Sequence, residues 1–262
     1  MKKYFIFPLF LTFIFTTHLS LSQTTITESF EGAFPGGGTC SSWGSFDCPN
    51  TFFEDTDDTS PTGFWNGSDD DTSTYSASYT RGWKVQEGGT PSSYTGPSGA
   101  QDGDRYIFCE TSGGGDDANF ILESDVFTAT SVSTFSFYYH MYGSNIGVLK
   151  AESSSNGGTS WTTLFTISEQ QQGSSGASWT QVSAGITSGF LSVPSGTNRL
   201  RLKYSGDGSS YKGDAAVDNI VVTYSSGPSI TVGSAISNLN YPQGSGPSAS
   251  QSTTVSGSSL EA

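Results

Sequence analysis

The sequence is poor in basic side chains. Lysine and arginine together number 10, against 24 aspartate and glutamate residues, which gives the 262-residue chain a formal net charge of −14. A surface of this sign repels the phosphate backbone of DNA and RNA, so we expect no nucleic acid among the partners of this segment. Cations are the charged partners that such a chain favours.

Histidine is almost absent as well, because the two copies are His18 and His140. A serine or cysteine nucleophile needs a neighbouring base, and the sequence contains no G-x-S-x-G, no HExxH and no paired Cys/His pattern. Glycosidases can work with two carboxylates alone, but the E-x-D-x-x-E pattern of sandwich glycosidases is missing too. We therefore predict no catalysis and rank a glycosidase-like enzyme third, behind two binding functions.

Long apolar runs are confined to the N-terminus. Residues 1–22, MKKYFIFPLFLTFIFTTHLSLS, combine a dibasic start, an apolar stretch broken by Pro8, and small residues at Ser20 and Ser22. This pattern is typical of a secretory signal peptide cut near Ser22. The apolar run is shorter than the roughly 20 residues of a membrane-spanning helix. We expect a secreted product, extracellular or at the cell surface, without membrane insertion.

Cysteine occurs three times, as Cys40, Cys48 and Cys109. Secretion permits disulfides, and the closeness of Cys40 and Cys48 around SSWGSFD predicts that these two pair. Cys109 in YIFCET is left over. A lone cysteine on a strand is more often a small buried apolar group than a nucleophile, so we expect it in the core.

Helical periodicity is missing too, whereas glycine is abundant with 33 copies. Short runs in which apolar and polar residues alternate recur between turn signals, among them DRYIFCET, ANFILES, STFSFYYHM, GVLKAES, WTTLFTIS, NRLRLKY and AVDNIVVTY. Evenly spaced short strands predict an antiparallel sandwich or barrel, because a parallel sheet needs helical crossovers. The expected fold class is all-β.

The end of the chain differs from the rest. After Tyr224 a short linker, SSGPS, leads into a segment that alternates again but stops after two or three expected strands, too few to bury a core. We interpret residues 227–262 as a linker and the truncated start of a second β module, and residues 23–226 as the main sandwich. Any catalytic domain would then lie beyond Ala262.

Four motifs mark the main segment: SFEG at 29–32, TPSSYTGP at 90–97, YYHMYG at 138–143 and AVDNI at 216–220. Together they resemble the MAM domain, a family named for meprin, the A5 antigen and a receptor phosphatase, which also occurs in secreted bacterial proteins. The resemblance runs from about Glu28 to Tyr224. It implies a jelly-roll sandwich of two antiparallel sheets that serves adhesion or recognition. Many members carry a cysteine where this chain has Asp125, so the family's disulfide pattern does not carry over whole.

The stretch FYYHMYG is the first candidate binding site. Alternate side chains of a strand share a face, so one set is expected in the core: Phe135, Phe137, Tyr139 and Met141. The opposite set comprises Tyr138, His140 and Tyr142. Its rings would suit stacking on sugars or anchoring a protein partner. The alternative, which the motif favours, is that a loop or a neighbouring strand covers them and that they are structural.

Four carboxylates from three separated segments are candidate cation ligands: Glu31, Asp102, Asp104 and Asp218. The first and last strands of a jelly roll lie close together, so these groups could converge on a hard cation such as calcium, which takes six to eight oxygen ligands. The resemblance implies a structural ion, with Glu31 and Asp218 at matching motif positions. Alternatively, Asp102 and Asp104 close turns around Gly103 and Asp218 accepts backbone N–H groups.

A strip of basic residues is expected on one strand. In NRLRLKY, three residues face inward: Leu200, Leu202 and Tyr204. The outward set is Arg199, Arg201 and Lys203. The strip could dock a sulfated or uronic polysaccharide, but pairing with acids on adjacent strands is commoner and is our expectation.

These features predict a non-catalytic extracellular adhesion or recognition module of a larger secreted bacterial protein. It would be stabilised by a structural cation, and its partner would be an extracellular protein or a polysaccharide. The alternative is a carbohydrate-binding module that uses Tyr138, His140 and Tyr142.

Overall fold

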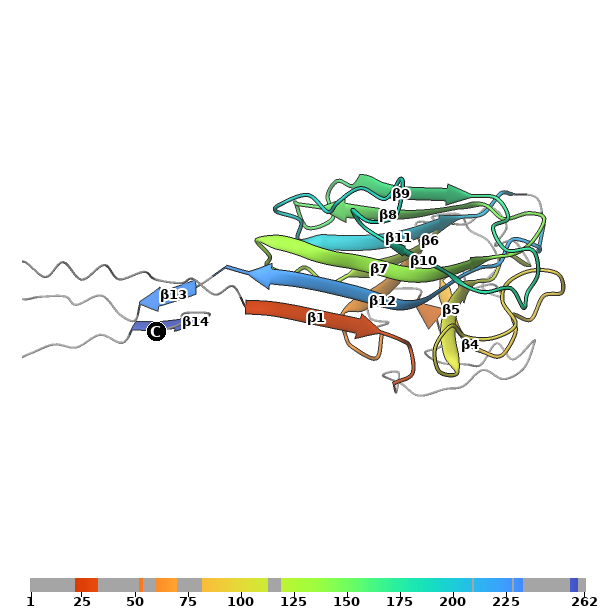
Figure 1. The fold of residues 1–262 in the computed structure, drawn as a ribbon, viewed down its shortest axis with the longest axis horizontal. Coiled ribbons are helices and arrows are strands. Elements are labelled where there is room, and N and C mark those ends of the chain that lie inside the picture. The colour runs from red at the N-terminus through yellow and green to blue at the C-terminus, as the bar shows by residue number, and fades with distance from the viewer. Residues whose placement is uncertain are drawn as a thin grey trace, which may run out of the picture. The chain divides into compact units, whose positions relative to one another are not determined.

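The alternating runs of the sequence form β-strands in the computed structural model (Figure 1), which describes residues 22–32, 52–53, 60–69, 82–112, 119–208, 210–227, 229–232 and 255–258. Residues 23–226 form one unit, and residues 1–22 and 227–262 are grouped as another.

In the second unit, β13 (Ser229–Val232) pairs antiparallel with β14 (Val255–Ser258). Apart from Ser22, the predicted signal peptide lies outside the described residues, as do Cys40 and Cys48. Among the described residues, no helix has the length and hydropathy needed to cross a lipid bilayer.

The larger sheet of the main unit has seven strands. Its order is β10 (Thr180–Ser183), β7 (Ser131–Met141), β12 (Ala215–Ser226), β5 (Arg105–Cys109), β4 (Trp83–Glu87) and β2 (Phe52–Phe53), and β1 (Ser22–Glu28) also pairs with β12. The long strands β7 and β12 run antiparallel, with a register shift between Asp218 and Val221. Asn219, inside this irregularity, has a positive φ of 49°, which is the local bend expected of a β-bulge.

The smaller sheet has five strands. Its order is β3 (Trp65–Asp69), β6 (Asn119–Ser124), β11 (Arg199–Ser205), β8 (Val148–Ser154) and β9 (Thr162–Ser168). Their neighbouring pairs are antiparallel. Figure 1 shows β9, β8 and β11 in one layer and β7, β12 and β1 in the other. The predicted all-β sandwich of two antiparallel sheets is therefore confirmed.

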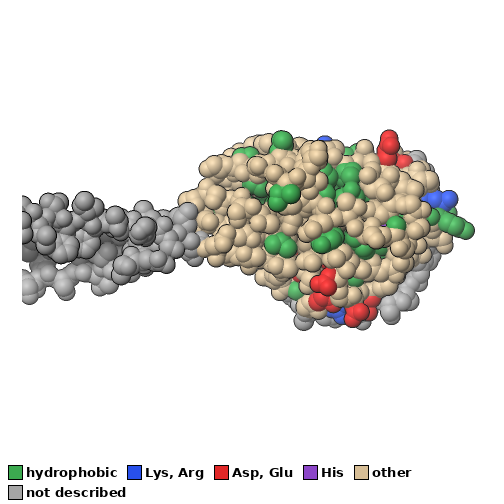
Figure 2. Space-filling model, viewed as in Figure 1, with side chains coloured by type: hydrophobic (Ala, Val, Ile, Leu, Met, Phe, Trp, Pro, Cys, Tyr) green, Lys and Arg blue, Asp and Glu red, His purple; other side chains and the backbone are tan. Residues whose placement is uncertain are grey.

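Uncharged groups dominate one face of this sandwich. In the view of Figure 2 most of the surface is backbone or uncharged polar side chain, and charged side chains are sparse.

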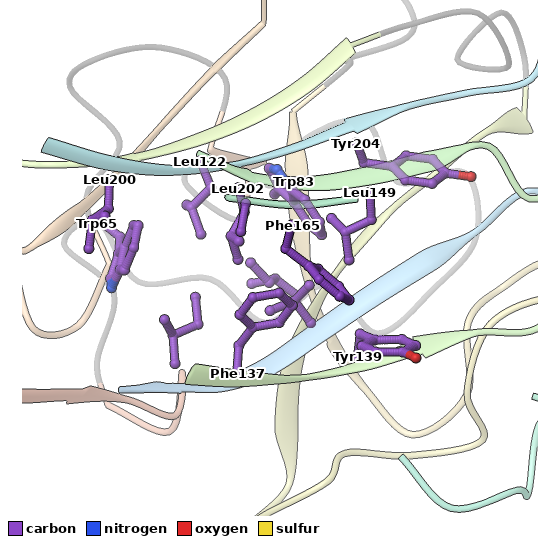
Figure 3. Close-up of a cluster of buried hydrophobic side chains, with 14 of the residues drawn as sticks. Trp65, Trp83, Leu122, Phe137, Tyr139, Leu149, Phe165, Leu200, Leu202 and Tyr204 are labelled. Carbon is purple, nitrogen blue, oxygen red and sulfur yellow. The ribbon is translucent and has the colours of Figure 1, made fainter. Parts of the chain in front are cut away.

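The core lies between the two sheets, where inward side chains of both meet (Figure 3). The four residues predicted inward on β7 are at most 4% exposed, and Leu200, Leu202 and Tyr204 of β11 are fully buried, so both alternation patterns are confirmed. Phe137 packs edge-on against Phe165 at 6.4 Å between ring centroids. Cys109 is buried and free, as predicted, and burial raises the pKa of its thiol well above the usual value.

Candidate functional site

The outer face of the seven-stranded sheet carries the candidate platform. In the register, His140 lies opposite Ala216, and Ala216 lies opposite Phe108. The side chain of His140 is fully buried, while Tyr138 and Tyr142 are half-buried. The ring of Trp179 covers His140 at 5.5 Å between centroids. A loop residue therefore covers His140, as the structural alternative expected, because the imidazole faces a tryptophan ring and not solvent.

Gln172 fastens the segment that covers this face. Its side chain is 4% exposed. Its Oε1 accepts a hydrogen bond from the backbone N–H of Met141 at 2.7 Å, and its Nε2 donates to Oγ1 of Thr180 at 3.0 Å. Because one amide satisfies a backbone group at the end of β7 and a hydroxyl at the start of β10, the connection between β9 and β10 is tied to the sheet.

A second connection closes over the same face. The indole N–H of Trp179 donates to the carbonyl of Gly99 at 3.2 Å, and the N–H of Ser98 donates to the carbonyl of Ser175 at 2.8 Å. The connections between β4 and β5 and between β9 and β10 are thus hydrogen-bonded to each other. Together they form a cover that alternation along β7 could not reveal.

Burial controls the charge of His140. Both ring nitrogens are buried without a hydrogen-bond partner of ordinary geometry among the described residues. Burial lowers the pKa of His140 to about 4, and the nearby backbone of Ala177 and Ser174 acts in the opposite direction. The imidazole is therefore neutral at physiological pH, which suits a packed side chain.

Two of the four predicted ion ligands, Glu31 and Asp218, converge on one loop. Glu31 Oε1 accepts hydrogen bonds from the N–H groups of Asp104 and Arg105 at 2.9 and 2.6 Å. Asp218 Oδ2 accepts from the N–H groups of Gln101 and Asp102 at 2.9 and 3.2 Å. Asp102 and Asp104 are exposed, and these contacts use their main chain. The part of the alternative in which Asp218 accepts backbone N–H groups describes its contacts.

Burial and a neighbouring negative charge both act on the carboxylate of Asp218. Burial raises the pKa of Asp218 to about 7; its three backbone N–H partners lower that pKa, and the charge of Glu31 raises it. Two carboxylates that interact electrostatically with each other could both bind a hard cation, and backbone oxygens could supply its remaining ligands. Within the described ranges, however, no group of three or more His, Cys, Asp or Glu side chains is placed to hold a metal ion. The donor chemistry fits calcium, but the four carboxylates do not gather around one point.

Asp214 is a buried acid that sequence reasoning missed. Its side chain is fully buried, and Oδ1 accepts from the N–H and Oγ1 of Thr111 at 3.1 and 3.2 Å. Burial, followed by the charge of Glu110, raises its pKa well above the usual value. The N–H of Asp214 donates to Oγ1 of Thr95 at 2.8 Å. The residue joins segments 119 positions apart in sequence, and its only local signal was a second aspartate just before AVDNI.

Two of the three basic residues in the strip on β11, Arg199 and Arg201, are paired with glutamates, as predicted. Arg199 Nη2 lies 3.0 Å from Glu123 Oε2, and Arg201 Nε lies 2.6 Å from Glu152 Oε2. The guanidinium of Arg201 also lies 4.2 Å from the ring centroid of Trp161. These charges are satisfied within the sheet and are not open to a polysaccharide.

Exposed large apolar and aromatic side chains avoid the strands. Those of the described residues that are most exposed are Tyr94, Val126, Ile186, Leu191 and Tyr211. All five lie in connections between strands. The sandwich therefore presents its apolar contact groups from loops on a rigid scaffold.

Comparison with solved structures gives distant likenesses. A cleaved adhesin domain of Lys-gingipain from Porphyromonas gingivalis is 16% identical, covers 76% of this chain and 97% of its own, and has a TM-score of 0.47. A Stig cyclase from Fischerella sp. is 13% identical, with 78% and 100% covered and a TM-score of 0.42. A family 11 carbohydrate-binding module of a Clostridium thermocellum cellulase is 14% identical, with 61% and 86% covered and a TM-score of 0.30. Their functions differ, so these likenesses do not bear on what this chain does.

The sequence matches one protein family directly. The model of that family, described as "MAM domain, meprin/A5/mu", matches residues 57–226. The match covers more than half of the chain and includes three of the four motifs, TPSSYTGP, YYHMYG and AVDNI. The predicted resemblance is confirmed, and the chain belongs to the MAM domain family.

Proposed function

We propose that this chain is a non-catalytic extracellular adhesion or recognition module of a larger secreted bacterial protein. Membership of the MAM family supports the proposal. The observation that carries it is the placement of the exposed apolar side chains, which lie in strand connections and not on the sheets. Loops held by a rigid scaffold are where binding residues concentrate. The partner is an extracellular protein or a polysaccharide.

Carbohydrate binding is the second candidate, favoured by the exposed tyrosines. Tyr94 is 71% exposed and Tyr211 is 46% exposed, and flat aromatic faces with polar tips suit sugar rings. The platform on β7 contributes less to this candidate, because His140 is covered and Tyr138 and Tyr142 are half-buried.

A binding survey tests these two candidates. The full chain would be presented to an array of glycans and to surfaces coated with extracellular proteins. Retained adhesion to protein-coated surfaces without a glycan signal supports protein recognition, whereas selective glycan binding supports the second candidate. Loss of that glycan signal in Tyr142→Ala would show that the glycan-binding site is the β7 platform. Release of reducing sugar from any polysaccharide would contradict the non-catalytic proposal.

We also propose that calcium binds beside the loop of residues 101–105. Glu31 and Asp218 would hold it, with backbone oxygens completing its shell. The raised pKa of Asp218, caused first by burial and increased by the charge of Glu31, supports this proposal because a cation would relieve both effects. Its role is structural, since both carboxylates already organise the loop.

A further inference from the structure

Two exposed tyrosines and a lysine form a distinct surface, which we call the loop-end surface: Tyr94, Tyr211 and Lys212. The ammonium of Lys212 lies 5.5 Å from the ring centroid of Tyr94 and 5.7 Å from that of Tyr211. The positive charge is therefore within reach of two exposed rings, although Tyr211 is less open to solvent than Tyr94.

The backbone on either side of Tyr94 is fixed. Thr95, which is 2% exposed, accepts the N–H of Asp214 on its Oγ1 at 2.8 Å, and its carbonyl accepts the hydroxyl of Thr90 at 2.8 Å. The N–H of Gly96 donates to the carbonyl of Tyr142 at 2.8 Å. Because its neighbours are tied to the sandwich, Tyr94 projects from an anchored loop.

The backbone of Lys212 is fixed as well. Its carbonyl accepts the N–H of Asn145 at 3.0 Å, and the following N–H, of Gly213, donates to Oγ1 of Thr111 at 3.1 Å. A Cβ placed on Gly143 would lie 2.2 Å from the carbonyl oxygen of Lys212 and 2.8 Å from Oγ1 of Thr95. Three chain segments therefore meet at a point that accepts only glycine, and the loop-end surface is preorganised.

Tyr94 also carries backbone strain. Its φ is +66°, in the left-handed region that residues with a Cβ adopt at a cost. Glycine would occupy this position without that cost, and the ring of Tyr94 gains little from packing, because it is 71% exposed. Little packing within the molecule therefore offsets the cost of a bulky residue at this position.

The charge of Lys212 is available to a partner. No ion pair joins it to any residue in the described part of the chain, whereas Arg105, Arg199 and Arg201 are all paired with glutamates. The rest of the chain is strongly acidic, and exposed charges are largely screened only beyond about 8 Å at physiological ionic strength. The ammonium is the positive charge that this surface offers to an anionic group.

We infer that the loop-end surface binds an anionic glycan, whose sugar rings stack on Tyr94 and Tyr211 while a carboxylate or sulfate pairs with Lys212. This inference rests on the proposed function and names its ligand class. The rings supply flat apolar contact, the ammonium supplies charge complementarity, and the fixed backbone limits the entropy lost on binding. A neutral glycan would leave the ammonium without a counter-charge.

Affinity electrophoresis and calorimetry of the full chain test the inference, with polygalacturonate as the carboxylated probe, dextran sulfate as the sulfated probe and a neutral galactan for comparison. We expect binding to at least one anionic probe, weaker at 500 mM than at 50 mM NaCl. Lys212→Gln should weaken it about tenfold, and Tyr211→Ala by roughly fivefold to tenfold. Ile186→Ser, at an 84% exposed residue in another connection, is the matched control and should change nothing.

Tyr94→Gly separates the role of the ring from its role in folding. Glycine relieves the positive φ, so the thermal midpoint should stay equal or rise while binding to the anionic probe falls. Equal binding by the parent and all three loop-end variants overturns the inference, as does equal affinity for the neutral galactan. If no anionic probe binds but adhesion to another surface persists, the inference falls and the proposed function stands. If the chain binds neither glycans nor protein-coated surfaces, both fall.

Discussion

The two faces of β7 are buried in different ways. On the inner face, Phe137 meets other rings across the sandwich, so that packing there is mainly between apolar side chains. On the outer face, His140 lies beneath Trp179, and hydrogen bonds from Gln172 hold the covering segment. A sheet face can thus be closed either by a second sheet or by loops tied down through polar side chains. The second kind of cover depends on a few hydrogen bonds and is the easier one to open.

The largest effect should come from the inner face. Phe137→Ala removes a fully buried ring from the core, and such truncations lower the free energy of unfolding by about 3–5 kcal/mol. Urea denaturation followed by tryptophan fluorescence would measure the loss. Tyr138→Ala, one position along the same strand but half-buried on the outer face, is the matched control and should lose clearly less. Equal losses would contradict the contrast between the two faces.

The outer face should make stability depend on pH. Because the folded pKa of His140, about 4, lies below its ordinary value of 6.5, the unfolded chain takes up the proton first as the pH falls. This contribution is complete above pH 6.5, is lost between pH 6.5 and about 4 by up to roughly 1.4 kcal/mol per pH unit, and levels off below that. Unfolding free energies of the parent and His140→Gln should be compared across this range. The difference between the two free energies removes the contribution of the titrating carboxylates, which both proteins share. Free energies that change in parallel with pH would contradict the prediction.

Removing the cover should open the outer face without breaking the fold. Trp179 is partly exposed, so Trp179→Ala should cost about 2 kcal/mol, less than a core truncation. Solvent would reach the imidazole, and the pKa of His140 should rise from about 4 towards 6.5. An NMR titration of the histidine ring protons follows this directly. A pKa that stays near 4 in the variant would mean that other groups bury the ring.

The contrast between the faces also explains how far the sequence could be interpreted. Alternation placed Phe137 and Leu202 inward, because a strand leaves only two choices and the apolar set takes the core. It also predicted that Arg201 would be paired, although not with Glu152 in particular. The cover over His140 was beyond such reasoning, since its residues lie in loops without periodicity. The loop-end surface was missed for the same reason: Tyr94 and Lys212 are brought together by hydrogen bonds between segments more than 100 residues apart.

The smallest expected effect concerns the carboxylates beside the loop of residues 101–105. If calcium binds Glu31 and Asp218 only in the folded chain, a tenfold excess over its dissociation constant stabilises by about 1.4 kcal/mol and raises the thermal midpoint by roughly 3–6 °C. Midpoints measured with calcium and with chelator should differ by that amount in the parent and coincide in Asp218→Ala. Asp207→Ala, at an acid away from this loop, should keep the parent's response. A response that persists in Asp218→Ala would place the ion elsewhere. If calcium does not change the midpoint of the parent, the calcium proposal is wrong. The role of both carboxylates is then to accept the hydrogen bonds from the loop's N–H groups.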